Sequence, residues 1–139
     1  MLRVSVLLLL FVPFSLWAED TKAQFLTDYI VGSYRLIGKA PESNNTYYGT
    51  IEFRKISNKL HVIRTINNTM THGNAEAEQV LHGETEILRI KFSEGGIDYE
   101  ETCLIDSDLD NYARLTCYLY RRGEKTKEPG LEAYFITHG

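Results

Sequence analysis

Two cysteines, Cys103 and Cys117, are the residues whose type and spacing most directly predict a chemical bond. Each lies seven positions from Asp110, near the centre of a polar cluster at 106–111. If the chain turns over there, the two cysteines face each other across antiparallel strands, at a Cα separation of about 4.5–5.5 Å that a disulfide spans. In an oxidising compartment such a pair forms a disulfide. The alternative is two buried free thiols.

Other groups that often carry catalysis or metal binding lack a suitable arrangement. The four histidines are scattered without ligand spacing, and neither cysteine belongs to a Cys-x-x-Cys pair. Glu100 and Glu101 are neighbours in a predicted strand and so face opposite ways, which makes them a poor acid/base pair. Asp106, Asp108 and Asp110 alternate, but the glycine and distal glutamate of an EF-hand are missing, so we expect a solvated turn. We therefore expect no enzyme active site, no metal site and no cofactor.

The amino-terminal segment predicts export. It carries one positive charge, Arg3, then an apolar run over 4–17 that contains Pro13, and it ends at the small residue Ala18. This is the anatomy of a cleavable signal peptide, and the run is shorter than the roughly 20 apolar residues of a membrane span. No cysteine follows the cut to take a lipid anchor. We predict a signal peptide at 1–18, a single mature domain at 19–139, a periplasmic or secreted location and no stable membrane anchor.

Composition and charge limit the partners of the mature domain. The whole chain has 15 basic and 19 acidic residues, a net charge of −4. This balance argues against nucleic acid, whose phosphates select basic surfaces.

The hydrophobic pattern then predicts the elements that position these residues. Asp20 can cap a short helix that runs to about Ile30. From Gly32 onward, short runs of β-branched and aromatic residues alternate with turn residues, as in antiparallel strands. The eight predicted strands are 33–38, 46–56, 60–66, 72–80, 86–92, 97–105, 113–120 and 131–138. Short connections without crossover helices favour an all-β, up-and-down antiparallel barrel of about eight strands, and the alternative is a β-sandwich.

The start of the first strand adds a resemblance to a known family. A short helix, then Gly32-Ser33-Tyr34, then about eight meandering strands resembles the lipocalin-like calycin group. In that group a glycine, one residue and a tryptophan open the first strand, and the tryptophan packs across the barrel floor. Here Tyr34 replaces the tryptophan. The resemblance implies a lipocalin-like barrel with a cup for a small apolar or amphipathic ligand, or a barrel that grips another protein.

The fourth predicted strand suggests where such a cup would be. Gly73, Ala75 and Ala77 share one face and have little side-chain volume, so they would leave room inside the barrel. Arg64 faces this space if the turn before its strand sets that register, and Tyr118 does so only if its side of the strand points inward. The predicted ligand-binding residues are Tyr34, Tyr47, Phe53, Arg64, Leu88 and Tyr118.

Two functions remain open. The first is a non-catalytic exported barrel that holds a small lipophilic molecule. The second is a barrel that binds an exported protein partner, as an inhibitor or secreted interaction factor, through its acidic hairpin tip and the basic loop at 121–130. An enzyme would need a polar, pKa-shifted pair inside the barrel, which the sequence does not locate.

Overall fold

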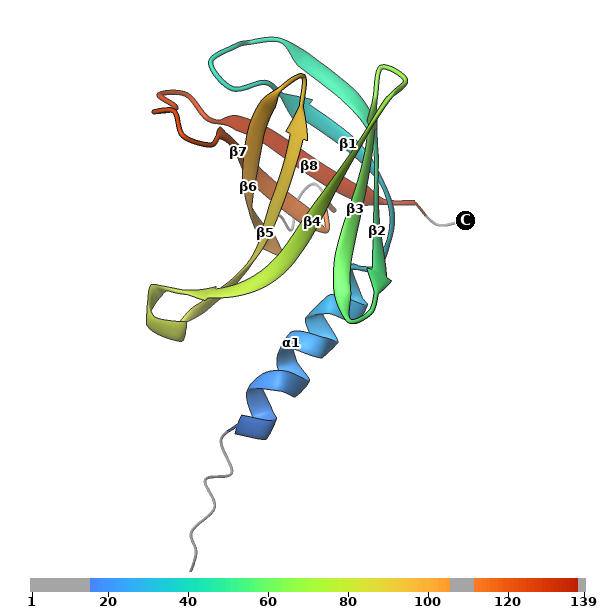
Figure 1. Cartoon of the computed structure of the whole chain (residues 1–139), viewed down its shortest axis with the longest axis vertical. Coiled ribbons are helices and arrows are strands. Elements are labelled where there is room, and N and C mark those ends of the chain that lie inside the picture. The colour runs from blue at the N-terminus through green and yellow to red at the C-terminus, as the bar shows by residue number, and fades with distance from the viewer. Residues whose placement is uncertain (1–15, 106–111, 138–139) are drawn as a thin grey trace, which may run out of the picture.

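Eight antiparallel strands close into a barrel in which each strand pairs with its sequence neighbours and β8 pairs with β1 (Figure 1). The computed structural model describes residues 16–105 and 112–137, without the side chains of 16–21 and 23. The closed barrel confirms the all-β prediction and excludes the sandwich. The elements are α1 (Leu16–Ile30), β1 (Gly32–Lys39), β2 (Thr46–Ile56), β3 (Lys59–Ile66), β4 (Thr69–Val80), η1 (Leu81–Gly83), β5 (Thr85–Glu94), β6 (Ile97–Ile105), β7 (Leu115–Arg121) and β8 (Gly130–Ile136).

Three two-residue turns fix the register of the hairpins. Both central residues have positive φ in Ser57-Asn58 (49° and 64°), Asn67-Asn68 (49° and 62°) and Gly95-Gly96 (59° and 76°). Such turns match the right-handed twist of the strands they join, which is why asparagine and glycine are favoured in them. The first of these turns directs Arg64 into the barrel, as its predicted register requires, and Arg64 is 2% exposed.

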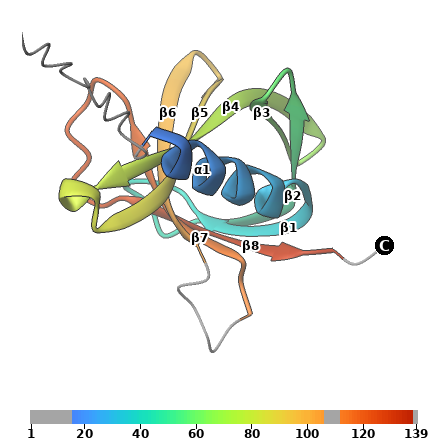
Figure 2. The same cartoon turned by 90° about the horizontal axis from the view of Figure 1, so that it is seen from below.

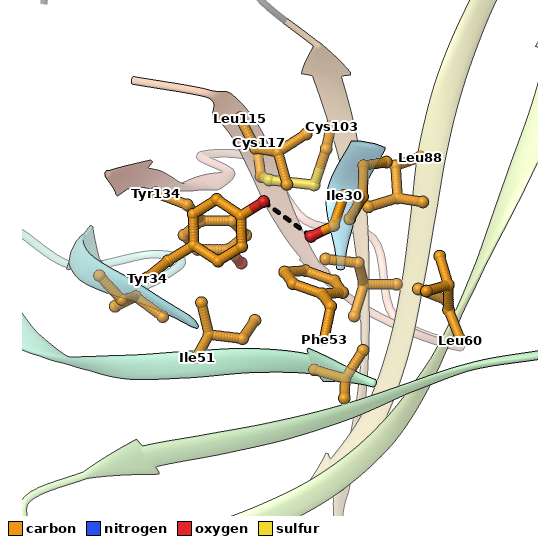
Figure 3. Close-up of a cluster of buried hydrophobic side chains, with 14 of the residues drawn as sticks. Ile30, Tyr34, Ile51, Phe53, Leu60, Leu88, Cys103, Leu115, Cys117 and Tyr134 are labelled. Atoms are coloured by element: carbon orange, nitrogen blue, oxygen red, sulfur yellow. Dashed lines mark hydrogen bonds between the residues drawn. A yellow bond between two sulfur atoms is a disulfide. The ribbon is translucent and has the colours of Figure 1, made fainter. Parts of the chain in front are cut away.

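The end of α1 closes one end of the barrel. Figure 2 shows α1 lying across that end, and its last residue, Ile30, is fully buried. Tyr34 lies beside it and donates a hydrogen bond from its hydroxyl to the Ile30 carbonyl oxygen at 2.7 Å (Figure 3). Tyr34 also meets Phe53 edge-to-face at 5.6 Å between ring centroids. Aromatic packing and one buried hydrogen bond therefore form the barrel floor.

The predicted disulfide is present and points into the barrel. Cys103 and Cys117 are directly opposed between β6 and β7, with their sulfur atoms bonded at 2.05 Å. Both are buried beside Leu88 and Leu115 (Figure 3). The symmetric spacing about Asp110 thus predicted the pairing correctly, although the turn at 106–111 and its three aspartates lie outside the described residues.

The observed elements differ from the predicted ones mainly at their ends. Strands β2 and β6 have the predicted bounds, whereas β4 begins at Thr69 because the Asn67-Asn68 turn pairs Thr69 directly with Ile66. Helix α1 begins at Leu16, so the predicted cut after Ala18 would fall within it. Most of the predicted leader lies outside the described residues. No helix in the described part of the chain combines the length and apolar character needed to span a bilayer.

Candidate functional site

A cluster of charged side chains occupies the middle of the barrel. The Arg64 guanidinium from β3 makes two hydrogen bonds to the Glu132 carboxylate of β8, Nη1 to Oε2 at 2.7 Å and Nη2 to Oε1 at 2.8 Å. Its Nη1 also lies 3.4 Å from Oε1 of Glu101 on β6. All three side chains are at most 2% exposed. One arginine therefore faces two buried carboxyl groups.

Two tyrosines complete the hydrogen bonding of this cluster. The Tyr134 hydroxyl oxygen lies 2.7 Å from Oε2 of Glu101 and 2.6 Å from Oε2 of Glu132. A phenol has one proton, so it cannot donate to both carboxyl groups at once. A protonated Glu101 resolves this, since it can donate to Tyr134 while Tyr134 donates to Glu132. Tyr47 donates to the other oxygen of Glu132.

The environment separates the pKa values of the two carboxyl groups. Burial, together with the adjacent charge of Glu132, raises the pKa of Glu101 well above its usual value. Burial also acts to raise the pKa of Glu132, but the charge and hydrogen bonds of Arg64 outweigh it and bring that pKa to about 2. The directions of these shifts and the single proton of the Tyr134 phenol both place the shared proton on Glu101 and leave Glu132 ionised. The cluster has one positive and one negative charge.

This cluster contains the pKa-shifted pair that sequence reasoning failed to locate. The sequence-based prediction compares Glu101 only with its neighbour Glu100 and does not include the burial of Glu132. The available signal was the strand alternation, because Glu101, Cys103 and Glu132 occupy inward positions between apolar residues. An acid/base pair is chemically present, but both carboxyl groups are enclosed by protein.

A small hollow opens at the barrel mouth, above this cluster. It measures about 160 Å³ and is lined partly by Tyr47, Arg64, Phe92 and Tyr99. The Arg64 guanidinium carbon lies 4.0 Å from the centroid of the Phe92 ring, and Phe92 stacks on Tyr99 at 5.2 Å. Ligand pockets usually span about 300–1,000 Å³, so this hollow suits only a very small molecule or a single side chain.

The six predicted ligand-binding residues fall into three places. Tyr47 and Arg64 line the mouth hollow, whereas Tyr34, Phe53 and Leu88 pack together at the floor. Tyr118 lies on the outer surface and is 48% exposed, so the expectation that it lines the lumen is wrong. Its neighbour Cys117 faces inward to reach Cys103, and strand alternation then turns Tyr118 outward.

A larger hollow, the notch, lies beside β4. It measures about 520 Å³ and occupies a notch in the barrel wall between the start of β3 and the middle of β4, next to α1. Ala75 and Ala77 line it, but it lies in the barrel wall and not in the lumen, where the sequence predicts the room that their small side chains leave. Gly73 does not line it. A Cβ at position 73 would lie 2.5 Å from the Lys91 carbonyl oxygen, so the absence of a side chain there allows β4 to pack closely against β5. The lining residues are Thr27, Asn58, Lys59, Leu60, His61, Asn74, Ala75, Glu76 and Ala77.

A third hollow, the outer groove, follows β8 on the outside of the barrel. It measures about 400 Å³, with Ala133 and Thr116 between larger side chains from β1, β6 and β7. Strand register places Ile37, Ala133, Thr116 and Leu104 in one row across four strands. Ile37 is 56% exposed, and Leu104, Tyr118 and Leu131 are also exposed. The groove is therefore an apolar surface that the described chain leaves uncovered.

Comparison with protein-family models and with curated proteins finds no relative of this chain. The fold defines a closed eight-stranded antiparallel barrel with a short amino-terminal helix and an internal disulfide. Function must therefore be inferred from the surfaces and side chains themselves.

Proposed function

We propose that this protein is an exported, non-catalytic binding barrel and that it holds an exported protein partner in the outer groove. The observation that carries the proposal is the groove itself, an exposed apolar hollow of about 400 Å³ on the outer wall. Large apolar patches on a soluble surface often mark interaction sites. The proposal replaces the acidic tip and basic loop of the sequence-based hypothesis with the wall made by β1, β7 and β8.

The state of the lumen supports an outer site over an internal one. At the floor, Ile30, Tyr34, Phe53 and Tyr134 are at most 1% exposed and in mutual contact. The level above contains the Arg64–Glu132 ion pair, which an apolar ligand would have to break or desolvate. A lipophilic molecule at this depth would displace the protein's own side chains. This favours a binding function on the outside.

The charges around the groove indicate the chemistry of the partner. Strands β1 and β8 carry three charged residues, and the acidic one, Glu132, points inward. The two that face outward, Arg35 and Lys39, are cations in a chain whose net charge is −4. Lys39 lines the groove. A partner with apolar side chains flanked by Asp or Glu would match this surface, and the charges would speed its association.

Site-specific photocrosslinking in the cells that export the protein tests this proposal. A photoreactive residue at Leu131 lies in the groove, and one at His72 lies on the exposed face of β4, away from it. We expect a crosslinked partner from position 131 and none from 72. The purified partner should then bind the Ala133→Arg variant about tenfold or more weakly than wild type, since a charge fills the apolar hollow.

The matched control is His72→Arg, which adds the same charge outside the groove and should leave affinity unchanged. Equal crosslinking from both positions would contradict the proposal. So would a purified partner that binds Ala133→Arg as tightly as the wild-type protein. Export is tested by sequencing the amino terminus of protein recovered outside the cytoplasm, which we expect to begin at Glu19.

A second candidate function is carried by the notch beside β4. Its volume of about 520 Å³ lies in the range of small-molecule pockets, and it combines apolar Leu60 and Ala75 with polar His61 and Asn74. This composition suits an amphipathic molecule better than a purely apolar one. Delipidated protein titrated with a panel of amphipathic probes should show saturable quenching of tyrosine emission. Absence of quenching by every probe would remove this candidate.

A further inference from the structure

Strand β4 has an edge that the barrel does not pair. The ladder between β3 and β4 ends at Leu60 and Ala75, whereas β4 continues to Val80 and pairs with β5 up to Thr85. Residues 76–80 therefore have a strand partner only on the β5 side. Among the described residues, no backbone hydrogen bond from outside the ladders reaches this stretch. Figure 1 shows β4 and β5 curving together beyond the end of the barrel.

Residues 76–80 have the unpaired backbone N–H and C=O groups that the addition of a strand requires. Along an antiparallel strand, alternate residues direct both their N–H and C=O groups to the same side. The open side of 76–80 therefore carries donors and acceptors that an added strand can pair with. Proteins commonly block such edges with proline, bulges, charged side chains or a covering helix. Residues 76–80 contain no proline and pair with β5 in continuous register, and α1 reaches the hollow beside them through Thr27. An extended peptide can bind such an edge as an additional strand.

The hollow beside the edge determines which side chains suit one face of an added strand. Ala75 and Ala77 present small side chains toward the hollow of about 520 Å³, and Leu60, the ladder partner of Ala75, lines it beside them. Side chains of an added strand alternate between the two faces of the sheet. Those on the hollow's side would enter the space that the alanines leave. Apolar side chains on that side would contact Leu60 and the two alanines. The polar lining residues His61, Asn74 and Glu76 alternate with these along their strands and belong to the other face.

The charges on the other face of β4 determine which side chains suit the remaining positions of the added strand. Glu76 and Glu78 point to the face opposite the alanines. Glu78 is 3.1 Å from Arg89, whereas Glu76, the ladder partner of Arg89, is exposed and makes no ion pair among the described residues. Opposite charges on adjacent strands attract, and like charges repel. A second copy of this edge would bring Glu76 and Glu78 against glutamates, which disfavours self-pairing.

We propose that an extended segment of another protein adds as a strand to residues 76–80, with apolar residues facing the hollow and Lys or Arg facing Glu76. This site is separate from the outer groove and does not rest on the function proposed for it. The groove selects an acidic, apolar surface, and the edge selects a basic, apolar strand.

A capped nonapeptide that alternates lysine with valine is a direct probe. Hydrogen exchange should show that a peptide concentration of about 1 mM slows exchange at the amides of 76–80 that face the open side by about tenfold or more. The same peptide methylated on alternate backbone nitrogens should give no protection, since methylation removes the donors that strand pairing needs. This control leaves the folded protein unchanged.

Two protein variants test the charge rule. Glu76→Lys should weaken the peptide by about fivefold, because an attraction across the new ladder becomes a repulsion. Glu84→Lys, at an exposed position beyond η1, makes the same change away from the edge and should have no effect. Ala133→Arg in the outer groove should also leave this binding unchanged.

Three results would overturn the proposal. The first is no protection of 76–80 at the peptide concentration given. The second is binding that survives backbone methylation. The third is protection that appears only on β1, β7 and β8, which would place the peptide in the outer groove. Saturable binding of small amphiphiles in the notch, with no peptide binding, would support the small-molecule candidate in its place.

Discussion

Arg64 and Glu132 form a two-point ion pair inside the barrel, with N–O distances of 2.7 and 2.8 Å and both side chains buried. Parallel hydrogen bonds of this kind fix the guanidinium and the carboxylate in one plane. They join β3 to β8 across the lumen, since these strands do not pair with each other. The pair therefore connects opposite walls of the barrel.

Removing the arginine should be strongly destabilising. Arg64→Met keeps most of the side-chain volume but leaves Glu132 as a buried, uncompensated charge, which costs about 3–5 kcal/mol in comparable cases. The loss should shrink as the pH falls toward 4, because burial without the arginine raises the pKa of Glu132 and the group becomes neutral. Urea denaturation at several pH values measures this. Arg54→Met, which breaks an exposed pair with Glu52, should leave stability unchanged. A loss for Arg64→Met that does not vary with pH would contradict this account.

The two carboxyl groups should give opposite pH dependences of stability. Glu132 has a lowered folded pKa, so its contribution is present above the unfolded value of about 4.3 and is lost as the pH falls toward 2. Glu101 has a raised folded pKa, so its contribution is complete below about 4.3 and is lost as the pH rises, by up to about 1.4 kcal/mol per pH unit. Glu101→Gln mimics the neutral acid and should remove that loss.

The expected outcome for Glu101→Gln is therefore stability close to wild type at pH 4 and above wild type at pH 8. Glu132→Gln should be destabilising at both pH values, but less so than Arg64→Met, because Glu101 can ionise and take over as the partner of Arg64. Free energies of unfolding measured from pH 3 to 8 test both statements. A Glu101→Gln variant that is less stable than wild type at pH 8 would show that Glu101 is ionised in the fold.

Much of the fold could be predicted because local signals and the global topology agree. The Ser57-Asn58 and Asn67-Asn68 turns mark hairpins, and the spacing of Cys103 and Cys117 fixes the register of a third. Closure could be argued from the absence of crossover helices. Strand length was less visible, since β4 extends past the end of β3 and nothing local to residues 76–80 shows that their neighbour is missing.

The candidate sites were harder to predict because they depend on which strands lie opposite each other across a space. Arg64, Glu101 and Glu132 come from three strands, and β6 and β8 are each separated from β3 by two others in the barrel. The outer groove combines residues of β1, β6, β7 and β8, each of which looks like an ordinary exposed position in its own strand. Strand alternation predicts on which face of the sheet a residue lies, but closure of the barrel decides which residues from other strands lie near it.

Reduction of the disulfide should lower the melting temperature. Cys103 and Cys117 are separated by 14 positions, and closing a loop of about 15 residues contributes roughly 3 kcal/mol in the chain-entropy model. Thermal unfolding with and without reductant measures the effect. A variant with both cysteines changed to alanine should melt near the reduced protein and should not respond to reductant. Equal melting of the wild-type protein in both conditions would contradict a stabilising role for the bridge.

Gly73 should tolerate no side chain, although Ala75 beside it does. A Cβ at position 73 would lie 2.5 Å from the Lys91 carbonyl oxygen and 2.9 Å from the Phe92 Cβ. Gly73→Ala must therefore push β4 from β5, and overpacking of this kind costs about 1–3 kcal/mol. Asn74→Ala, at an exposed neighbouring position, is the control and should unfold like wild type in urea. A Gly73→Ala variant as stable as wild type would show that the two strands lie further apart.

Tyr34→Phe should loosen the attachment of α1 to the barrel floor while keeping the aromatic packing. The Tyr34 hydroxyl is fully buried and donates to the carbonyl oxygen of Ile30, the last residue of the helix. Phenylalanine retains the ring against Phe53 but removes this donor, and a buried group that loses its partner costs about 1–3 kcal/mol. Hydrogen exchange should therefore speed up most in the last turn of α1, with a smaller change in β5 and β6, because the helix end is held by this contact and the barrel wall by its ladders.

Tyr48→Phe, which removes the same hydroxyl at an exposed position on β2, should change neither stability nor exchange. Uniform acceleration across all strands would mean that the hydrogen bond supports the whole barrel rather than the helix end.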